Sequence, residues 1–104
     1  MSWILEFRPE VADDVTEAAD WYESRESGLG AVFVEEIIRV WEKIVEHPHI
    51  GSRRHPTMDI RWRYPERFPY RVIYRISEDT ESILVVAVLH AARRDGGWQS
   101  RIGH

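Results

Sequence analysis

Residues 70–90 read YRVIYRISEDTESILVVAVLH, and this stretch decides the fold. Its first part, Tyr70 to Ile76, alternates between an apolar face and a face that carries arginine. After an acidic connection at residues 78–81, the run from Ile83 to Leu89 is apolar on both faces. Alternation predicts a strand that is half covered, whereas a run without alternation predicts a central strand. The stretch therefore predicts a β-hairpin whose second strand lies inside a sheet.

Two helices are predicted before this hairpin. The first begins at Pro9, which suits a first helical turn, and ends between Ser24 and Gly28. The second follows the break Gly28-Leu29-Gly30 and stops at His47-Pro48. Both carry an apolar stripe at helical spacing: Val11, Val15, Ala18, Ala19 and Tyr22 in the first, and Phe33, Val34, Ile37, Ile38, Trp41, Ile44 and Val45 in the second. The pair forms a helical hairpin that needs a sheet to cover its stripes.

Two further segments complete the predicted sheet. Trp3 to Phe7 reads as a first strand, and Ile60 to Tyr64 alternates before a turn at residues 65–69. The order is strand, helix, helix, strand, strand, strand and a C-terminal tail at residues 91–104, an α+β arrangement in which the helical hairpin covers one sheet face. The other face is predicted to carry an arginine ladder of Arg61, Arg63, Arg71 and Arg75 over an apolar floor. Such a face is either a binding surface or an unfinished core.

Composition limits the classes of function. With 104 residues, the chain predicts one compact domain over 1–104, and with no cysteine it has no disulfide, thiolate metal site or cysteine nucleophile. No run is long and apolar enough for a membrane span, and the N-terminus lacks signal-peptide features, so we expect a cytoplasmic protein. His47, His49, His55 and Asp59 fit no metal-ligand spacing, and no phosphate-binding loop is present, so we expect no metal or cofactor.

Charge is divided unevenly along the chain. Residues 1–50 hold four Lys/Arg and twelve Asp/Glu, whereas residues 51–104 hold ten and six. Lys43 is the sole lysine, and arginine favours bidentate contacts with carboxylates or phosphates. We therefore look for a partner on the basic half. The acidic face of the first helix, with Glu10, Asp13, Asp14, Glu17 and Asp20, is most simply a solvated surface, and a basic partner segment is the alternative.

Two other residues have open roles. His90 follows the apolar run, where its ring either locks the tail by a hydrogen bond or acts as an acid or base. Trp98 lies beyond the last strand, between glycines and Arg101. It either folds back as a plug or anchors a partner, since aromatic residues beside arginine are common interface hot spots.

The chain resembles ParE-like toxins of the RelE/ParE superfamily. The resemblance rests in the C-terminal half on Phe68 to Ile76, Ile83 to Ala92, Arg93 and Trp98. In the N-terminal half it rests on Phe7-Arg8-Pro9-Glu10, Ala18, Trp21-Tyr22-Glu23, Gly28-Leu29-Gly30 and Phe33. It implies a two-layer RelE/ParE-like fold with the first strand beside the Ile83 to Leu89 strand. It also implies the toxin of a chromosomal or plasmid-borne type II toxin–antitoxin pair, neutralised by a cognate antitoxin that forms a hetero-oligomer with it.

The superfamily offers two mechanisms, which are inhibition of DNA gyrase by binding and cleavage of ribosome-bound mRNA. Cleavage needs groups that transfer protons and cations that stabilise the transition state. Here the candidates are His90, Arg71 and Arg93, whereas no tyrosine follows Tyr74 and the net charge is −4, both departures from the RelE-type pattern. We therefore expect a gyrase-binding, ParE-like toxin. A RelE-like mRNA endoribonuclease and a non-toxic relic that still binds antitoxin remain the alternatives. The predicted partner-binding residues are Arg61, Arg63, Arg71, Arg75, Arg93, Arg94, Trp98 and Arg101.

Overall fold

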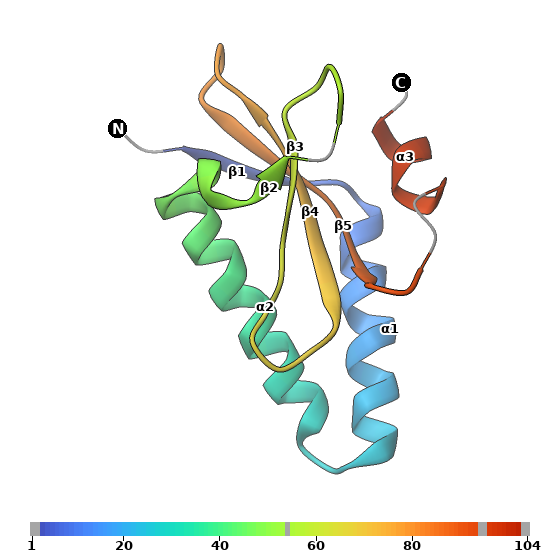
Figure 1. The fold of residues 1–104 in the computed structure, drawn as a ribbon. Coiled ribbons are helices and arrows are strands. Elements are labelled where there is room, and N and C mark those ends of the chain that lie inside the picture. Colours follow the sequence, from blue (N-terminus) through green and yellow to red (C-terminus); the bar gives the residue numbers. More distant parts are fainter. Residues whose placement is uncertain (1–2, 54, 94–95, 103–104) are drawn as a thin grey trace.

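The computed structural model describes residues 3–53, 55–93 and 96–102. Its elements, coloured along the chain in Figure 1, are β1 (Ile4–Phe7), α1 (Glu10–Arg25), α2 (Leu29–Glu46), the 3₁₀ turn η1 (Pro48–Ile50), β2 (Ser52–Arg53), β3 (Ile60–Arg63), β4 (Tyr70–Ser77), β5 (Ser82–His90) and α3 (Gly96–Ile102). The predicted α+β class and the order of its main elements are confirmed. The short strand β2 and the helix α3 were not predicted.

The five strands form one sheet in the order β1-β5-β4-β3-β2. β1 runs parallel to β5, and the other neighbours are antiparallel. The interior position of β5 is therefore confirmed, as is the place of the first strand beside it. β1 pairs with Ser82–Val85, and no other strand among the described residues lies on that side of the second half of β5. On the side of β5 that pairs with β4, a β-bulge leaves Val86 without a partner residue in β4.

The turn between α1 and α2 depends on two glycines. Gly28 has φ 89°, a left-handed conformation that favours glycine, and its amide donates to the Glu23 carboxylate at 2.9 Å. A Cβ at Gly30 would lie 2.7 Å from the Ala19 carbonyl oxygen, so the helices can only meet this closely at glycine. The Gly30 amide also donates to Glu23, at 3.0 Å. These two amides lower the pKa of the Glu23 carboxyl.

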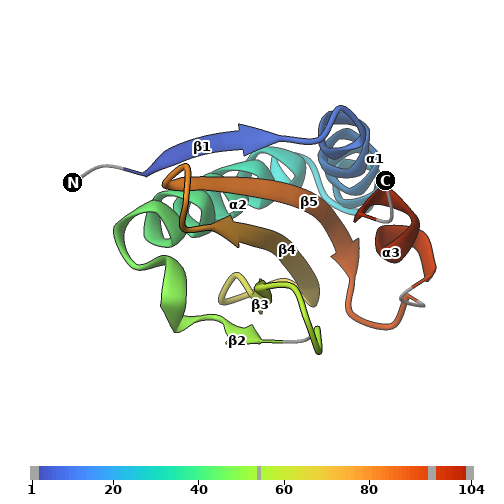
Figure 2. The ribbon, with the colours of Figure 1, turned by 90° about the horizontal axis from the view of Figure 1, so that it is seen from above.

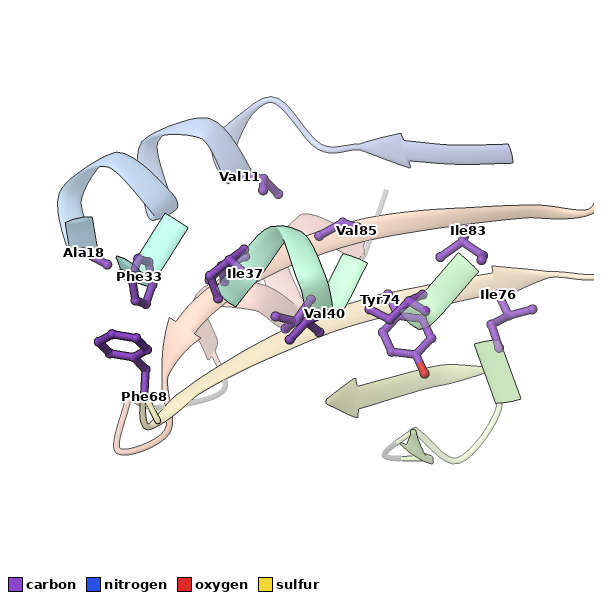
Figure 3. Packing of buried hydrophobic residues seen from close by; sticks show 13 residues of the cluster. Val11, Ala18, Phe33, Ile37, Val40, Phe68, Tyr74, Ile76, Ile83 and Val85 are labelled. Carbon is purple, nitrogen blue, oxygen red and sulfur yellow. The ribbon is translucent and has the colours of Figure 1, made fainter. Parts of the chain in front are cut away.

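The main core lies between the helical hairpin and one face of the sheet (Figure 3). Phe33 and Ile37 from α2 are fully buried against Val72, Tyr74 and Val85 of the sheet. These residues belong to the stripes and alternating positions that the sequence identified. Their burial is the main hydrophobic stabilisation of the hairpin on the sheet.

A second apolar cluster covers the opposite face of the sheet. Its buried members are Ile60, Ile73, Val86, Ala87, Leu89 and Trp98. Trp98 comes from α3, which lies beside β5 and close to α1 (Figure 2). The C-terminal segment therefore folds back over the face that the sequence left open. No helix in the described part of the chain is long and apolar enough to cross a membrane.

Candidate functional site

The predicted arginine ladder is divided between the two faces of the sheet. Arg61 lies opposite Tyr74 and Arg63 lies opposite Val72, both on the helix-covered face. Arg71 and Arg75 belong to the alternate positions of β4, on the second face. The expectation of four arginines on one face is therefore wrong. It failed because alternation fixes faces within a strand, whereas only the register relates one strand to the next.

Arg71 lies inside the molecule, with 2% of its surface exposed. Its guanidinium sits 4.3 Å from the centre of the Trp62 ring and donates a 2.7 Å hydrogen bond to the Arg93 carbonyl. Trp98, with 1% exposed, meets the Trp62 ring edge to face at 6.2 Å. The sequence left Trp98 as a plug or a partner anchor, and in this structure it is a plug. Neither Arg71 nor Trp98 presents a free surface to a partner here.

Arg101 is held by α1 and β5. It forms two hydrogen bonds with the Asp14 carboxylate, at 2.7 and 3.0 Å, and a third with the Val86 carbonyl at 3.0 Å. Asp14 also accepts a 3.0 Å hydrogen bond from the Val88 amide. The Asp14 contact raises the pKa of Arg101. Asp14 is therefore held in an ion pair and is not simply part of a solvated acidic face. The ion pair also provides hydrogen-bond partners for the Val88 amide and the Val86 carbonyl, which pair with no described strand on the β1 side.

Arg61 is also engaged within the chain. It donates to Asp59 at 2.8 Å, to the Gly51 carbonyl at 3.1 Å and to the His49 carbonyl. The side chains of His49, Asp59 and Glu78 bring ligand atoms within 4.8 Å of one another, a grouping that spacing along the chain does not reveal. His49 already contacts Glu78 at 2.6 Å, and Arg61 supplies positive charge to Asp59. Arg75 is half-buried, and Arg94 lies outside the described residues.

A groove of about 670 Å³ opens where β1 ends and α1 faces the bare half of β5. We call it the α1–β5 groove. Its lining residues are Asp14, Glu17, Ala18, Trp21, Tyr22, Pro69, Tyr70, Val88, Leu89, His90 and Arg93. The groove thus combines aromatic rings, an imidazole and an exposed arginine with an apolar floor from β5.

The groove contains one imidazole, that of His90, and two phenols, those of Tyr22 and Tyr70. The His90 Nδ1 accepts a 3.0 Å hydrogen bond from the Ala92 amide, so the neutral ring carries its proton on Nε2. The Tyr70 ring packs edge to face against His90 at 5.3 Å. Burial raises the pKa of Tyr70 and of Tyr22, so both phenols stay protonated at neutral pH. The two phenols are therefore not available as general bases at neutral pH.

Trp21 is the groove residue that sequence reasoning missed. It was not among the predicted partner-binding residues, although 51% of it is exposed. The Arg25 guanidinium lies 4.5 Å from the centre of its ring. Trp21 lies outside the apolar stripe that Ala18 and Tyr22 continue, and that position was the available signal. An exposed Trp with a stacked Arg is typical of an interface hot spot.

A separate apolar hollow of about 620 Å³ lies on the helical side of the molecule. Phe7 and the α1 residues Val15 and Ala19 line it together with Val34 and Trp41 of α2. Phe7 is 44% exposed, and Ile38 on the same helix as Trp41 is 43% exposed. An uncovered apolar surface of this kind is typical of a protein that binds a partner.

Comparison with known proteins identifies relatives of this chain. Residues 5–95 match the family model described as the ParE toxin of the type II toxin–antitoxin system parDE. A chain of the chromosomal ParDE system of P. aeruginosa has the same fold with a TM-score of 0.71 at 17% identity, over 85% of this chain and 95% of that chain. The isolated E. coli RelE toxin gives 0.63 at 17% identity, over 94% of each chain. The intact E. coli RelBE toxin–antitoxin complex gives 0.63 at 18% identity, over 88% of this chain and 99% of that chain. No curated protein matches by sequence.

Proposed function

Because this chain belongs to the ParE toxin family of type II toxin–antitoxin systems, we propose that it acts in the cytoplasm as a toxin that inhibits DNA gyrase by binding it. The observation that carries the proposal is that two of the three candidate catalytic groups, Arg71 and His90, already make contacts within the chain. Arg71 is buried against Trp62, and the His90 Nδ1 is engaged by the Ala92 amide. A general base for RNA cleavage must be free to take a proton from the ribose 2′-hydroxyl.

The α1–β5 groove is the proposed face for the target. Trp21, Arg25 and Arg93 present a large aromatic surface and positive charge beside the apolar floor. Such residues contribute most of the binding energy at protein interfaces. Binding without chemistry needs shape and hot spots rather than a free base, and the groove supplies these.

A cognate antitoxin is the second proposed partner. Solved structures of this fold include the E. coli RelBE complex, in which a toxin is bound to its antitoxin. The exposed apolar hollow between α1 and α2 supports the same expectation for this chain, since it leaves the side chain of Phe7 exposed to water. We expect the neighbouring small gene to encode this antitoxin and the two proteins to purify as a hetero-oligomer.

Two assays on the same purified toxin test the mechanism. One measures supercoiling by DNA gyrase, and the other measures cleavage of mRNA on programmed ribosomes. We expect inhibition of supercoiling without mRNA cleavage. The variant Trp21→Ala should weaken inhibition at least about tenfold, as expected for loss of a hot spot. Trp3→Ala serves as a matched control, because Trp3 is not part of the groove.

Substitution of His90 separates binding from catalysis. In an mRNA endoribonuclease that relied on His90 for proton transfer, His90→Gln would lower the cleavage rate by about 10²–10⁴-fold. In a gyrase-binding toxin, His90→Gln should weaken the inhibition of supercoiling only by as much as the loss of one contact. Cleavage of mRNA that disappears in His90→Gln, with supercoiling unaffected, would refute the proposal and favour the endoribonuclease.

A further inference from the structure

A second charged pocket, of about 360 Å³, lies between α2 and the end of β3. We call it the α2–β3 pocket, and it shares no residue with the α1–β5 groove. Its lining residues are Glu36, Arg39, Val40, Lys43, Arg63, Tyr64, Glu66 and Arg67. The four α2 members follow the spacing of one helix face, so the pocket runs along α2 for about two turns, roughly 10 Å. The sole lysine of the chain is among them.

Positive charge in this pocket exceeds what the protein itself neutralises. Glu36, buried with 5% exposed, accepts a 3.2 Å hydrogen bond from the Arg67 amide and also pairs with the Arg67 guanidinium. By contrast, Arg39 and Lys43 form no ion pair or side-chain hydrogen bond with any residue that the structure describes. Arg63 makes one long contact, 3.4 Å to the His47 carbonyl. Arg39, Lys43 and Arg63 thus outnumber the one other lining carboxylate, the exposed Glu66, and the pocket keeps an excess of positive charge for an external anion.

We propose that the α2–β3 pocket binds acidic side chains of an extended segment of the antitoxin. The inference rests on the proposed toxin–antitoxin function and adds the site and its ligand chemistry. Arg39 and Lys43 are one helical turn apart, which places their Cβ atoms about 6 Å from each other. Acidic residues at alternate positions of an extended segment are about 7 Å apart on one side, so each can meet one cation. Arginine adds bidentate contacts to a carboxylate.

The charge around the pocket favours a short acidic peptide over a nucleic acid. Glu35, Glu42 and Glu46 are exposed on the neighbouring stripe of α2, and the net charge of the chain is −4. A polynucleotide backbone that continued past the pocket would meet these carboxylates within the screening distance of about 8 Å. A peptide with two acidic residues can leave the pocket without that repulsion.

Peptide binding can be measured without disturbing the fold. The variant Arg39→Gln with Lys43→Gln removes two exposed cations that have no described partner, so we expect its melting temperature to stay within about 4 °C of wild type. The probe is a fluorescently labelled hexaglutamate peptide at low ionic strength. We expect the variant to bind it about tenfold more weakly, since each exposed charge pair contributes a few-fold.

The matched control is Arg53→Gln with Arg75→Gln, which changes the net charge equally outside the pocket. We expect it to weaken hexaglutamate binding by less than about twofold, because Arg53 and Arg75 lie outside the pocket and their attraction to the peptide is screened by salt. Equal weakening in the two variants would overturn the site. Tighter binding of a six-nucleotide single-stranded DNA than of hexaglutamate would overturn the peptide ligand. Gyrase inhibition by the wild-type toxin is measured separately, so a failed pocket leaves the proposed function standing.

Discussion

Replacing Trp98 by alanine tests whether α3 is an integral part of the fold. A buried tryptophan removes about 200 Å² from water, which contributes about 5 kcal/mol at roughly 25 cal/mol per Å². The indole N–H has no hydrogen-bond partner among the described residues, and burying it unpaired costs about 1–3 kcal/mol. We therefore expect Trp98→Ala to lower the free energy of unfolding by about 3 kcal/mol.

Urea denaturation followed by circular dichroism measures this loss. Trp98→Phe is the matched control, because it keeps most of the apolar area and removes the unpaired N–H, so its loss should be below about 1.5 kcal/mol. Hydrogen exchange should also become faster at the Val88 amide, whose partner Asp14 is tied to α3 through Arg101. A loss below about 1 kcal/mol in Trp98→Ala would show that α3 is only loosely docked and refute the reasoning.

Three further substitutions test individual contacts. Asp14→Asn leaves the largely buried Arg101 without its carboxylate and should cost about 3–5 kcal/mol of unfolding free energy, whereas adding Arg101→Met should recover part of that loss in the same denaturation assay. The pKa of Glu23 is lowered in the folded protein, so this carboxylate stabilises the fold above pH 4.5, its ordinary pKa, and the contribution is lost as the pH falls below that value. The melting temperature of Glu23→Gln should therefore decrease less than that of wild type when the pH is lowered into the acid range. Gly30→Ala places a Cβ 2.7 Å from a backbone carbonyl and should destabilise the protein by about 1–3 kcal/mol, while the control Gly97→Ala, whose Cβ has 4.0 Å to its nearest neighbour, should not.

The sequence predicted those parts of the fold that depend on local periodicity. The stripe from Phe33 to Ile44 and the run from Ile83 to Leu89 led directly to α2 and to the interior strand, because burial on one or both faces leaves a visible spacing. The turn at Gly28 was equally readable, since a left-handed residue favours glycine. The pairing of the first strand with β5 came from the family resemblance, because periodicity contains no information on strand order.

The site was harder to predict because it depends on contacts between distant segments. Asp14 and Arg101 are 87 residues apart, and nothing near either one signals the ion pair. The arginines of β3 and β4 could be assigned to faces only after the register was known. Trp98 lies on a helix of seven residues, too short for an amphipathic pattern to show which side is buried. Side chains that close a surface left open by the main elements are therefore the least predictable ones.

The free edge of β5 has a consequence for self-association. Beyond Val85, the most apolar strand of the sheet pairs with no described strand on the β1 side, and an unpaired edge of this kind is a template on which strands of other copies can add. The Asp14 and Arg101 side chains occupy the Val88 amide and the Val86 carbonyl, two groups that such a strand would use. Charged groups at a strand edge oppose intermolecular pairing and amyloid-like growth. The same ion pair that docks α3 therefore also opposes the addition of a strand from another copy at this edge.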